Sequence, residues 1–391
     1  MRNRVVWFSL LTVLVFPVAL FLGGCKQSAP QRVKIGVILP LTGNVAKIGE
    51  DLQKGMDVAY SLYRDSVRYK VDLVYKDSQG DPQKGVSAFR LLLFESPQPL
   101  GVIVALSTVT KALIPIADRE KIPLIATATS AAGLPQESEW VFRFFTQACA
   151  DAKAMAEFAV DSLGIKKVSI LALQNEFGQS YAACFKRYFE RKGGKIQTIE
   201  YYPPGETQFG PYVLKILRDT PDAVYLVGYT SSLPLIPRKI RELGKEVMIL
   251  GPGTIGEPWV IEQAGGSLEG AYYTGNLFDV QDTSQIPVRD FVRAFSERYQ
   301  GPPQYFNVFG YDLVRMLMKT IDQLPPTQLT REGLKETLLS IRSFNGVLGT
   351  IRVQPDGEIN FPVTIEYVKD GEPAGPVAVY FLEEDRVGGA P

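Results

Sequence analysis

The segment from residue 100 to residue 131 constrains the fold more than any other part of the chain. Residues 100–105 and 123–126 are short apolar runs, which is typical of strands buried on both faces of a parallel sheet. Between them, apolar residues recur at helical spacing at Val109, Ala112, Leu113, Ile116 and Ala117. The segment therefore predicts a strand, a helix that packs on the sheet, and a second strand parallel to the first.

Small hydroxyl side chains follow both predicted strands. Ser107 and Thr108 come after the first strand, and Thr127, Thr129 and Ser130 come after the second. In an open α/β sheet, ligands bind beyond the carboxyl ends of the strands, and neighbouring parallel strands end at the same edge. A helix that begins there also offers free N–H groups to an anion. The two turns together predict a cradle for a carboxylate.

The rest of the chain repeats this alternation. Its length of 391 residues suits two domains, and strands alternate with helices from residue 33 to 131 and again from 150 to 250. No linker rich in Gly, Ser or Pro separates the two series, so we expect two doubly wound parallel sheets of the α/β class, joined by strand-like crossings. With 42 basic and 42 acidic residues, the chain has no field that would attract nucleic acid, and no nucleic-acid partner is expected.

The amino terminus has the features of an export signal. Arg2 and Arg4 precede an apolar run over residues 5–22, and Gly23, Gly24 and Cys25 follow, which resembles the lipobox of bacterial lipoprotein signal peptides. An uncleaved membrane anchor is the alternative, because this run nearly spans a bilayer. The small residues before the cysteine favour cleavage. We expect a signal peptide over residues 1–24, lipidation of Cys25, a tether over residues 25–32 and a location on the extracytoplasmic face of the cell envelope, anchored to the membrane by lipid.

Cys149 and Cys184, both in predicted helices, are the remaining cysteines. Export permits a disulfide, but their spacing does not indicate one, so two buried free thiols are expected, with no metal site. The segment over residues 77–82 holds Asp77 and Asp81 but lacks the alternating acids of a calcium loop. Asp81 followed by Pro82 instead predicts the cap of a helix and a structural turn.

Catalytic chemistry is disfavoured. The chain has no histidine, which removes the commonest general base, Ser-His-Asp triads and most zinc sites. Ser107 and Lys111 could form a Ser-Lys pair, but Lys111 is expected to be solvated. Residues 251–256 match G-x-G-x-x-G, yet that fingerprint belongs at the first strand-helix turn of its unit and needs an acid at the end of the next strand, whereas Glu269 precedes its strand. We predict no catalytic residues and no cofactor.

Several short motifs, taken in order, carry a family resemblance. They are KIGVILPLTG at residues 34–43, KDSQGDPQKGV at 76–86, the turns at Ser107 and Ser130, Phe142-Arg143, NEFG at 175–178, Tyr311-Asp312 and FNGVLGTIRVQPDGE at 344–358. Together they resemble the leucine-binding family of type I periplasmic substrate-binding proteins, which serve bacterial ABC importers. The likeness extends over nearly all of the chain after residue 32.

The resemblance implies two lobes joined by three crossings near residues 147, 275 and 346, with a ligand bound between lobes that close by hinge motion. The amino-terminal lobe would comprise residues 33–147 and 276–345, and the carboxy-terminal lobe residues 148–275 and 346–384, followed by a tail over residues 385–391. The resemblance also implies ligand-binding residues. They are Ser107 in the first turn, Ala128 and Ser130 in the second turn, and the aromatic residues Phe177 and Tyr229 from the other lobe. The hydroxyl residues Thr108 and Thr129 of the same two turns are expected to bind the ligand as well.

One departure from the family pattern concerns the ligand's ammonium group. Amino-acid binders of this family carry a glutamate where this chain has Gly253, and burial of an ammonium without a counter-charge is costly. Glu257 could replace that glutamate if its loop folds inward; otherwise it is a solvated loop residue. Ile48 also replaces an aromatic residue that is common there.

The resulting hypothesis is a lipid-anchored protein that binds a small carboxylate-bearing solute and delivers it to an ABC permease, with a branched-chain or other aliphatic amino acid as the expected solute. The alternative is a sensory or envelope-regulating lipoprotein that uses the same fold to contact a sensor or a cell-wall enzyme. A bound small molecule in a closed cleft would favour the first, and an occluded cleft with an exposed apolar patch would favour the second.

Overall fold

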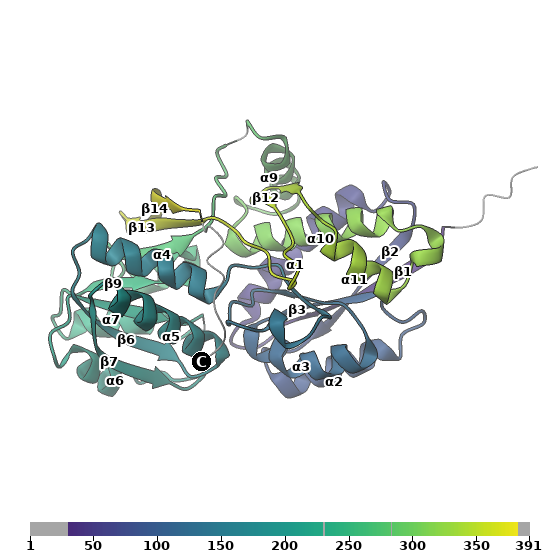
Figure 1. Ribbon diagram of the computed structural model, residues 1–391. Helices are drawn as coiled ribbons and strands as arrows, with labels where there is room; N and C mark the ends of the chain where they lie inside the picture. Colours follow the sequence, from purple (N-terminus) through teal and green to yellow (C-terminus); the bar gives the residue numbers. More distant parts are fainter. Residues whose placement is uncertain (1–29, 230, 283, 382–391) are drawn as a thin grey trace, which may run out of the picture. The chain divides into compact units, whose positions relative to one another are not determined.

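The computed structural model describes residues 30–229, 231–282 and 284–381 (Figure 1). The predicted signal peptide, Cys25, most of the predicted tether and the predicted tail therefore lie outside the described residues. From Gln31 onward the chain forms one unit, which contains two large sheets.

The first sheet consists of parallel strands in the order β2-β1-β3-β4-β5. Its elements are β1 (Arg32–Leu39), α1 (Ala46–Tyr63), β2 (Lys70–Asp77), α2 (Pro82–Leu93), β3 (Gly101–Ala105), α3 (Ser107–Glu120), β4 (Leu124–Thr127), the 3-10 turn η1 (Pro135–Glu137) and β5 (Val141–Arg143). The sequence predicted four of these strands. It did not predict β5, because three residues leading out of the sheet are too short to show a strand period.

The second sheet is parallel in its larger part and carries two antiparallel strands at one edge, in the order β14-β13-β10-β9-β8-β6-β7. Figure 1 shows β13 and β14, in yellow, beside the teal strands although they lie at the end of the chain. The elements are α4 (Ala148–Asp161), β6 (Lys167–Leu173), α5 (Glu176–Arg191), β7 (Lys195–Tyr202), α6 (Gly210–Leu217), β8 (Ala223–Val227), α7 (Leu235–Glu242), β9 (Met248–Gly251), η2 (Gly253–Gly256), α8 (Pro258–Ala264), β10 (Tyr272–Gly275), β13 (Val363–Lys369) and β14 (Glu372–Tyr380).

The segment between β10 and β13 returns to the first sheet. It contains α9 (Ile286–Arg298), α10 (Tyr305–Gln323), η3 (Pro326–Gln328), α11 (Arg331–Leu339) and the hairpin of β11 (Phe344–Gly346) and β12 (Gly349–Ile351). Helix α10 packs closely on α1, and Gly55 permits this close approach because it has no side chain. A Cβ atom at Gly55 would lie 1.9 Å from the carbonyl oxygen of Asn307. We use "first lobe" for the first sheet with these helices and "second lobe" for the second sheet with its helices.

The third crossing between the lobes lies later than predicted. Val347, Leu348, Ile351 and Phe361 are buried in the core of the first lobe, whereas Val363 belongs to a core of the second. These contacts place the crossing between residues 361 and 363 and not near residue 346. The crossing near residue 346 is an expectation from the family resemblance, and the sequence pattern of this stretch does not show which core receives its side chains.

The two helical cysteines form a disulfide, so the prediction of free thiols is wrong. Cys149 in α4 and Cys184 in α5 are 35 residues apart in sequence, and their Cα atoms are 5.0 Å apart. The two helices pack against each other, which brings the thiols together. This packing is a tertiary relationship that the spacing of cysteines along the chain does not encode.

The predicted helix cap at Asp81 is confirmed. Its carboxylate accepts a hydrogen bond from the backbone N–H of Lys84 at 2.9 Å, and Pro82 is the first residue of α2. Asp77 has a structural role as well, since its Oδ1 accepts from the backbone N–H groups of Leu41 and Gln79, both at 2.8 Å. The turns after β1 and β2 are thereby held together.

Candidate functional site

The strands β3 and β4 end in matching turns. Ala105 pairs with Thr127 in the parallel register, and the next residue of each strand has a positive φ angle, 76° at Leu106 and 45° at Ala128. This backbone conformation costs a residue with a side chain about 1–2 kcal/mol and is often found where a ligand binds. Both residues line a pocket.

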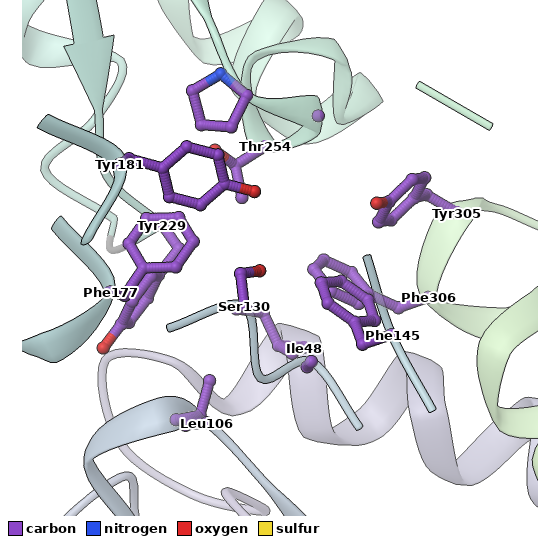
Figure 2. A pocket seen from close by; sticks show the side chains of 13 residues that line it. Ile48, Leu106, Ser130, Phe145, Phe177, Tyr181, Tyr229, Thr254, Tyr305 and Phe306 are labelled. Carbon is purple, nitrogen blue, oxygen red and sulfur yellow. The ribbon is translucent and has the colours of Figure 1, made fainter. Parts of the chain in front are cut away.

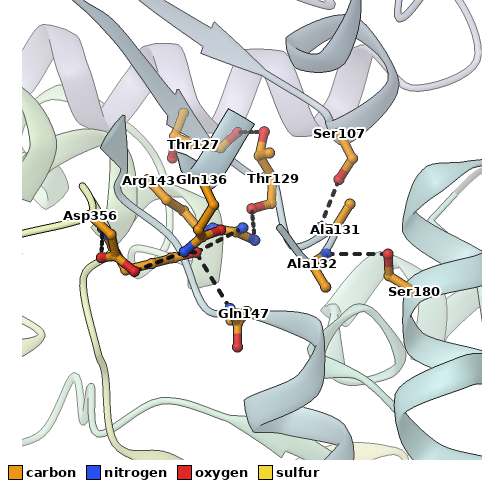
Figure 3. A network of polar contacts seen from close by, with 11 residues as sticks. Ser107, Thr127, Thr129, Ala131, Ala132, Gln136, Arg143, Gln147, Ser180 and Asp356 are labelled. Carbon is orange, nitrogen blue, oxygen red and sulfur yellow. Dashed lines mark hydrogen bonds and ion pairs between the residues drawn. The ribbon is translucent and has the colours of Figure 1, made fainter. Parts of the chain in front are cut away.

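The predicted proximity of the Ser107 and Ser130 turns is present. Ser107 is the first residue of α3, and its Oγ accepts a hydrogen bond from the backbone N–H of Ala131 at 3.1 Å (Figure 3). Ser130 is 1% exposed, lines the pocket, and its Oγ has no hydrogen-bond partner among the described residues. Figure 2 shows its side chain extending into the space between the lining residues. Ser107 joins the turns, and Ser130 offers a free hydroxyl, as does Thr254 from the second lobe.

The two predicted threonines lie elsewhere. Thr108 Oγ1 donates to Glu176 Oε2 in the second lobe at 2.7 Å. Thr129 Oγ1 donates to the carbonyl oxygen of Thr127 at 2.9 Å and shares a hydrogen bond with the Thr110 hydroxyl at 3.0 Å. Neither threonine is among the residues that line the pocket.

Phe177 and Tyr229 line the pocket from the second lobe, where the resemblance placed them. Their rings meet edge to face with centroids 5.0 Å apart. The hydroxyl of Tyr229 accepts a hydrogen bond from Asn175 Nδ2 at 2.7 Å, and burial raises the pKa of Tyr229 to about 12. Asn175 also caps α5, so one side chain fixes both the start of this helix and the tyrosine.

Most of the lining was not singled out from the sequence. Within the described part of the chain, no charged side chain lines the pocket. The remaining lining residues are Ile48 and Gly253, which the sequence singled out as departures from the family pattern, and Phe145, Tyr181, Pro252, Thr254, Tyr305 and Phe306, which it did not single out. Tyr181 was accessible to sequence reasoning, because it lies one helical turn after Phe177 on α5. Tyr305 and Phe306 come from a distant helix and gave no local signal.

Gly253 lines the pocket at the start of η2. A Cβ atom there would lie 2.9 Å from the carbonyl oxygen of Thr274 and 3.3 Å from Cζ of the Tyr305 ring. The position therefore has no room for a larger side chain while Tyr305 occupies its present place.

Glu257 folds inward and is 2% exposed. Its Oε1 has no partner among the described residues, and burial together with nearby Asp51 raises the pKa of Glu257 to about 8, against the opposing effect of Lys47. The side chain is not among the residues that line the pocket. The loop thus folds inward and buries Glu257, which is one of the two alternatives that the sequence allows, but Glu257 is not part of the pocket wall.

A second buried carboxyl group, Asp151, was not predicted. It lies in the first turn of α4, and its Oδ2 accepts hydrogen bonds from the hydroxyls of Tyr181 at 2.6 Å and Thr146 at 3.3 Å. Burial raises the pKa of Asp151 to about 7. Thr146 also shares a 3.5 Å hydrogen bond with Tyr305, so this polar chain fixes the hydroxyls of two lining tyrosines.

The second turn is held from behind by Arg143, which is fully buried at the end of β5. Its Nη1 donates to the carbonyl oxygen of Thr129 at 3.1 Å, and its Nε lies 3.0 Å from Glu358 Oε2 in an ion pair (Figure 3). The motif at Phe142-Arg143 thus supports the turn and makes no contact with the pocket.

Comparisons with known proteins agree with this geometry. A model of the family described as "periplasmic binding protein" matches residues 32–373. The chain belongs to the periplasmic binding protein family. This periplasmic binding protein is similar to the Leu/Ile/Val-binding protein homolog 3 of Brucella melitensis. The two sequences are 24% identical over an alignment that covers 87% of this chain and 92% of the relative. The resemblance to the leucine-binding family is confirmed.

Two solved structures have the same fold. The leucine-binding protein LivK of Thermotoga maritima aligns with a TM-score of 0.82 and 27% identity, over 89% of this chain and 98% of that one. A solute-binding protein of an ABC transporter from Rhodopseudomonas palustris, solved in complex with benzoate, aligns with a TM-score of 0.81 and 20% identity, over 89% and 96% of the two chains. The predicted type I fold with two α/β lobes is confirmed.

Membership settles two further predictions. Periplasmic binding proteins are solute-binding components without enzymatic activity, so this chain is not an enzyme. The family also implies an extracytoplasmic location. In the part of the chain that the structure describes, no helix is both long and apolar enough to cross a membrane.

Proposed function

We propose that this periplasmic binding protein is the substrate-binding component of an ABC importer and binds a small carboxylate-bearing solute in the pocket between its lobes. The observation that carries the proposal is the Ser130 hydroxyl, which is buried, faces the pocket and lacks a partner among the described residues. A buried hydroxyl without a partner costs free energy unless a ligand satisfies it. The first N–H groups of α3 lie beside it and favour an anion.

The names of similar proteins support a carboxylate. The Brucella relative is named for leucine, isoleucine and valine, and the Rhodopseudomonas structure contains benzoate. These ligands differ in their apolar groups and share a carboxylate. The part of the site that this chain keeps from the family pattern, at Ser107, Ala128 and Ser130, is the part assigned to that group.

We further propose that the lobes close around the solute by hinge motion. The first lobe would comprise residues 33–147 and 276–361, and the second residues 148–275 and 363–381. Two hydrogen bonds between the lobes support a closed form, one from Thr108 Oγ1 to Glu176 Oε2 and one from the backbone N–H of Ala132 to Ser180 Oγ at 3.2 Å. Figure 3 shows the second of these beside the Ser107 turn.

Lipid anchoring at Cys25 and delivery of the solute to a permease complete the proposal. The signal-like amino terminus supports the anchor. Metabolic labelling with a palmitate analogue tests it: label should enter the chain and be lost in Cys25→Ser. Label that persists in this variant, or never enters the chain, would refute the anchor without affecting the proposed binding site.

Calorimetry tests the carboxylate site. Each hydrogen bond to a charged group contributes roughly 1.5 to 3 kcal/mol, so Ser107→Ala with Ser130→Ala should weaken binding of a carboxylate ligand by a few kcal/mol. Ser169→Ala is the matched control, because Ser169 is also fully buried, its Oγ also lacks a described partner, and it does not line the pocket. Equal affinity of the double variant and the control would count against the site.

A further inference from the structure

The pocket has no partner for an ammonium group. In the described part of the chain its polar lining consists of hydroxyl and backbone groups, and carboxylates are absent from it. The position of Gly253 has no space for an acidic side chain, since a Cβ atom there would be too close to the carbonyl oxygen of Thr274 and would touch the ring of Tyr305. The family's acidic residue is therefore missing, and a neighbouring aromatic ring fills its place.

Two buried carboxyl groups, Asp151 and Glu257, lie outside the pocket lining. Asp151 is bonded through Oδ2 to the hydroxyls of Tyr181 and Thr146, with the tyrosine between it and the pocket. Glu257 is outside the lining and interacts electrostatically with Lys47 and Asp51 of α1. Burial raises the pKa of both carboxyl groups, which favours their neutral forms.

Aromatic rings face the pocket from both lobes. Phe177, Tyr181 and Tyr229 form one group in the second lobe, with centroids 4.8 Å apart for Phe177 and Tyr181. Phe145, Tyr305 and Phe306 form the other group in the first lobe, where the rings of Phe145 and Phe306 are nearly parallel with an interplanar angle of 3°. Figure 2 shows the two groups on opposite sides of the pocket with Ser130 between them. A flat apolar body held between these groups could keep its carboxylate at the Ser130 turn.

We infer that the solute is an aromatic monocarboxylate without an ammonium group. This inference rests on the proposed function and specifies its ligand. It sets the chain apart from the amino-acid binders that it resembles, because the anion-binding turns are kept and the ammonium-binding position is closed. Aromatic contacts on two sides suit a planar ring better than a branched aliphatic chain.

Matched ligand pairs test the inference on the mature chain, after unfolding and refolding to remove any solute that co-purifies. L-Phenylalanine and 3-phenylpropanoate differ in the ammonium group alone, and so do L-leucine and 4-methylpentanoate. Isothermal titration should show 3-phenylpropanoate binding at least tenfold tighter than L-phenylalanine, and 3-phenylpropanoate or benzoate binding tighter than 4-methylpentanoate. 3-Phenylpropanamide, which lacks the anionic group, should not bind measurably.

Other results have distinct meanings. An amino acid that binds as tightly as its ammonium-free partner would overturn the inference and leave the proposed carboxylate site intact. In that case Glu257→Gln and Asp151→Asn would identify the carboxyl group that serves the ammonium. Tightest binding of 4-methylpentanoate would overturn the aromatic part. Absence of binding by every carboxylate, in a refolded protein whose circular dichroism matches the native chain, would overturn the proposed function together with the inference.

Discussion

Thr108 Oγ1 donates a hydrogen bond of 2.7 Å to Glu176 Oε2, which joins the second residue of α3 to the first residue of α5 in the opposite lobe. The bond lies beside the pocket and can form only while the lobes are together. It therefore links the anion-binding turn to closure, although Thr108 itself does not line the pocket.

Loss of this bond should speed ligand release. Thr108→Val keeps the shape of the side chain and removes the donor to the Glu176 carboxylate, so the closed form should lose about 1.5–3 kcal/mol, which corresponds to a roughly 10- to 150-fold faster dissociation rate. Stopped-flow fluorescence of a bound aromatic acid measures this rate. Thr350→Val is the control, since that hydroxyl donates to Asn345 Oδ1 within the β11-β12 hairpin of the first lobe. An unchanged rate in Thr108→Val would show that the bond does not contribute to closure.

The pair of Arg143 and Glu358 should separate stability from binding. Removal of one member of a buried ion pair leaves the other charge unpaired, so Arg143→Met should lower the free energy of unfolding by about 3–5 kcal/mol. Arg143→Met with Glu358→Leu should recover most of that loss in denaturant titrations. The double variant should still bind ligand more weakly, because the hydrogen bond to the carbonyl oxygen of Thr129 is gone. Native affinity in the double variant would mean that Arg143 does not position the turn.

The sequence predicted the fold class and the anion-binding turns because both depend on local patterns. Apolar runs with helices between them indicate a parallel sheet, and hydroxyl residues directly after two neighbouring strands must meet at one edge. Ser107 and Ser130 lie together for this reason. The three-residue strand β5 and the crossing after Phe361 were missed, because neither has a pattern that identifies its partner.

The remaining site depends on contacts between distant segments. Tyr305 closes the space beside Gly253 from a helix about fifty residues away, and no periodicity predicts that contact. The sequence alone does not predict the inward turn of Glu257, because a glutamate after a glycine-rich loop is more often solvated. Thr108 and Thr129 were expected in the site on the basis of residue type, but their hydroxyls point toward other partners.

The disulfide should stabilise the second lobe. For cysteines 35 residues apart, the entropy of loop closure gives about 3–4 kcal/mol, so Cys149→Ala with Cys184→Ala should lower the free energy of unfolding by an amount of this order. Since neither cysteine is among the residues that line the pocket, ligand affinity should remain within twofold. Mass spectrometry of the alkylated native protein should find both thiols blocked from labelling. Two alkylated cysteines without reduction would contradict the pairing.

Glu257 should make stability depend on pH. Its pKa in the folded protein is about 8, above its ordinary value of 4.5, so the folded chain holds this proton more tightly than the unfolded chain. The resulting stabilisation is complete below about pH 4.5 and is lost as pH rises toward 8, by at most about 1.4 kcal/mol per pH unit. Asp151 and Asp312, with pKa values raised by burial to about 7 and about 6, act in the same direction at lower pH.

Glu257→Gln removes one of these three contributions and should flatten the fall in stability, most clearly between pH 7 and 8, where Asp312 has largely titrated and Asp151 is past its midpoint. The groups that face Glu257 are Lys47 and Asp51 of α1, Tyr273 of β10 and Tyr305 of α10, and none of them is altered by this substitution. Urea titrations at half-unit pH steps measure the slope. Glu262→Gln on the exposed side of α8 should keep the wild-type slope. If Glu257→Gln kept it as well, Glu257 would be ionised in the folded protein, and the case against a counter-charge for an ammonium would be weakened.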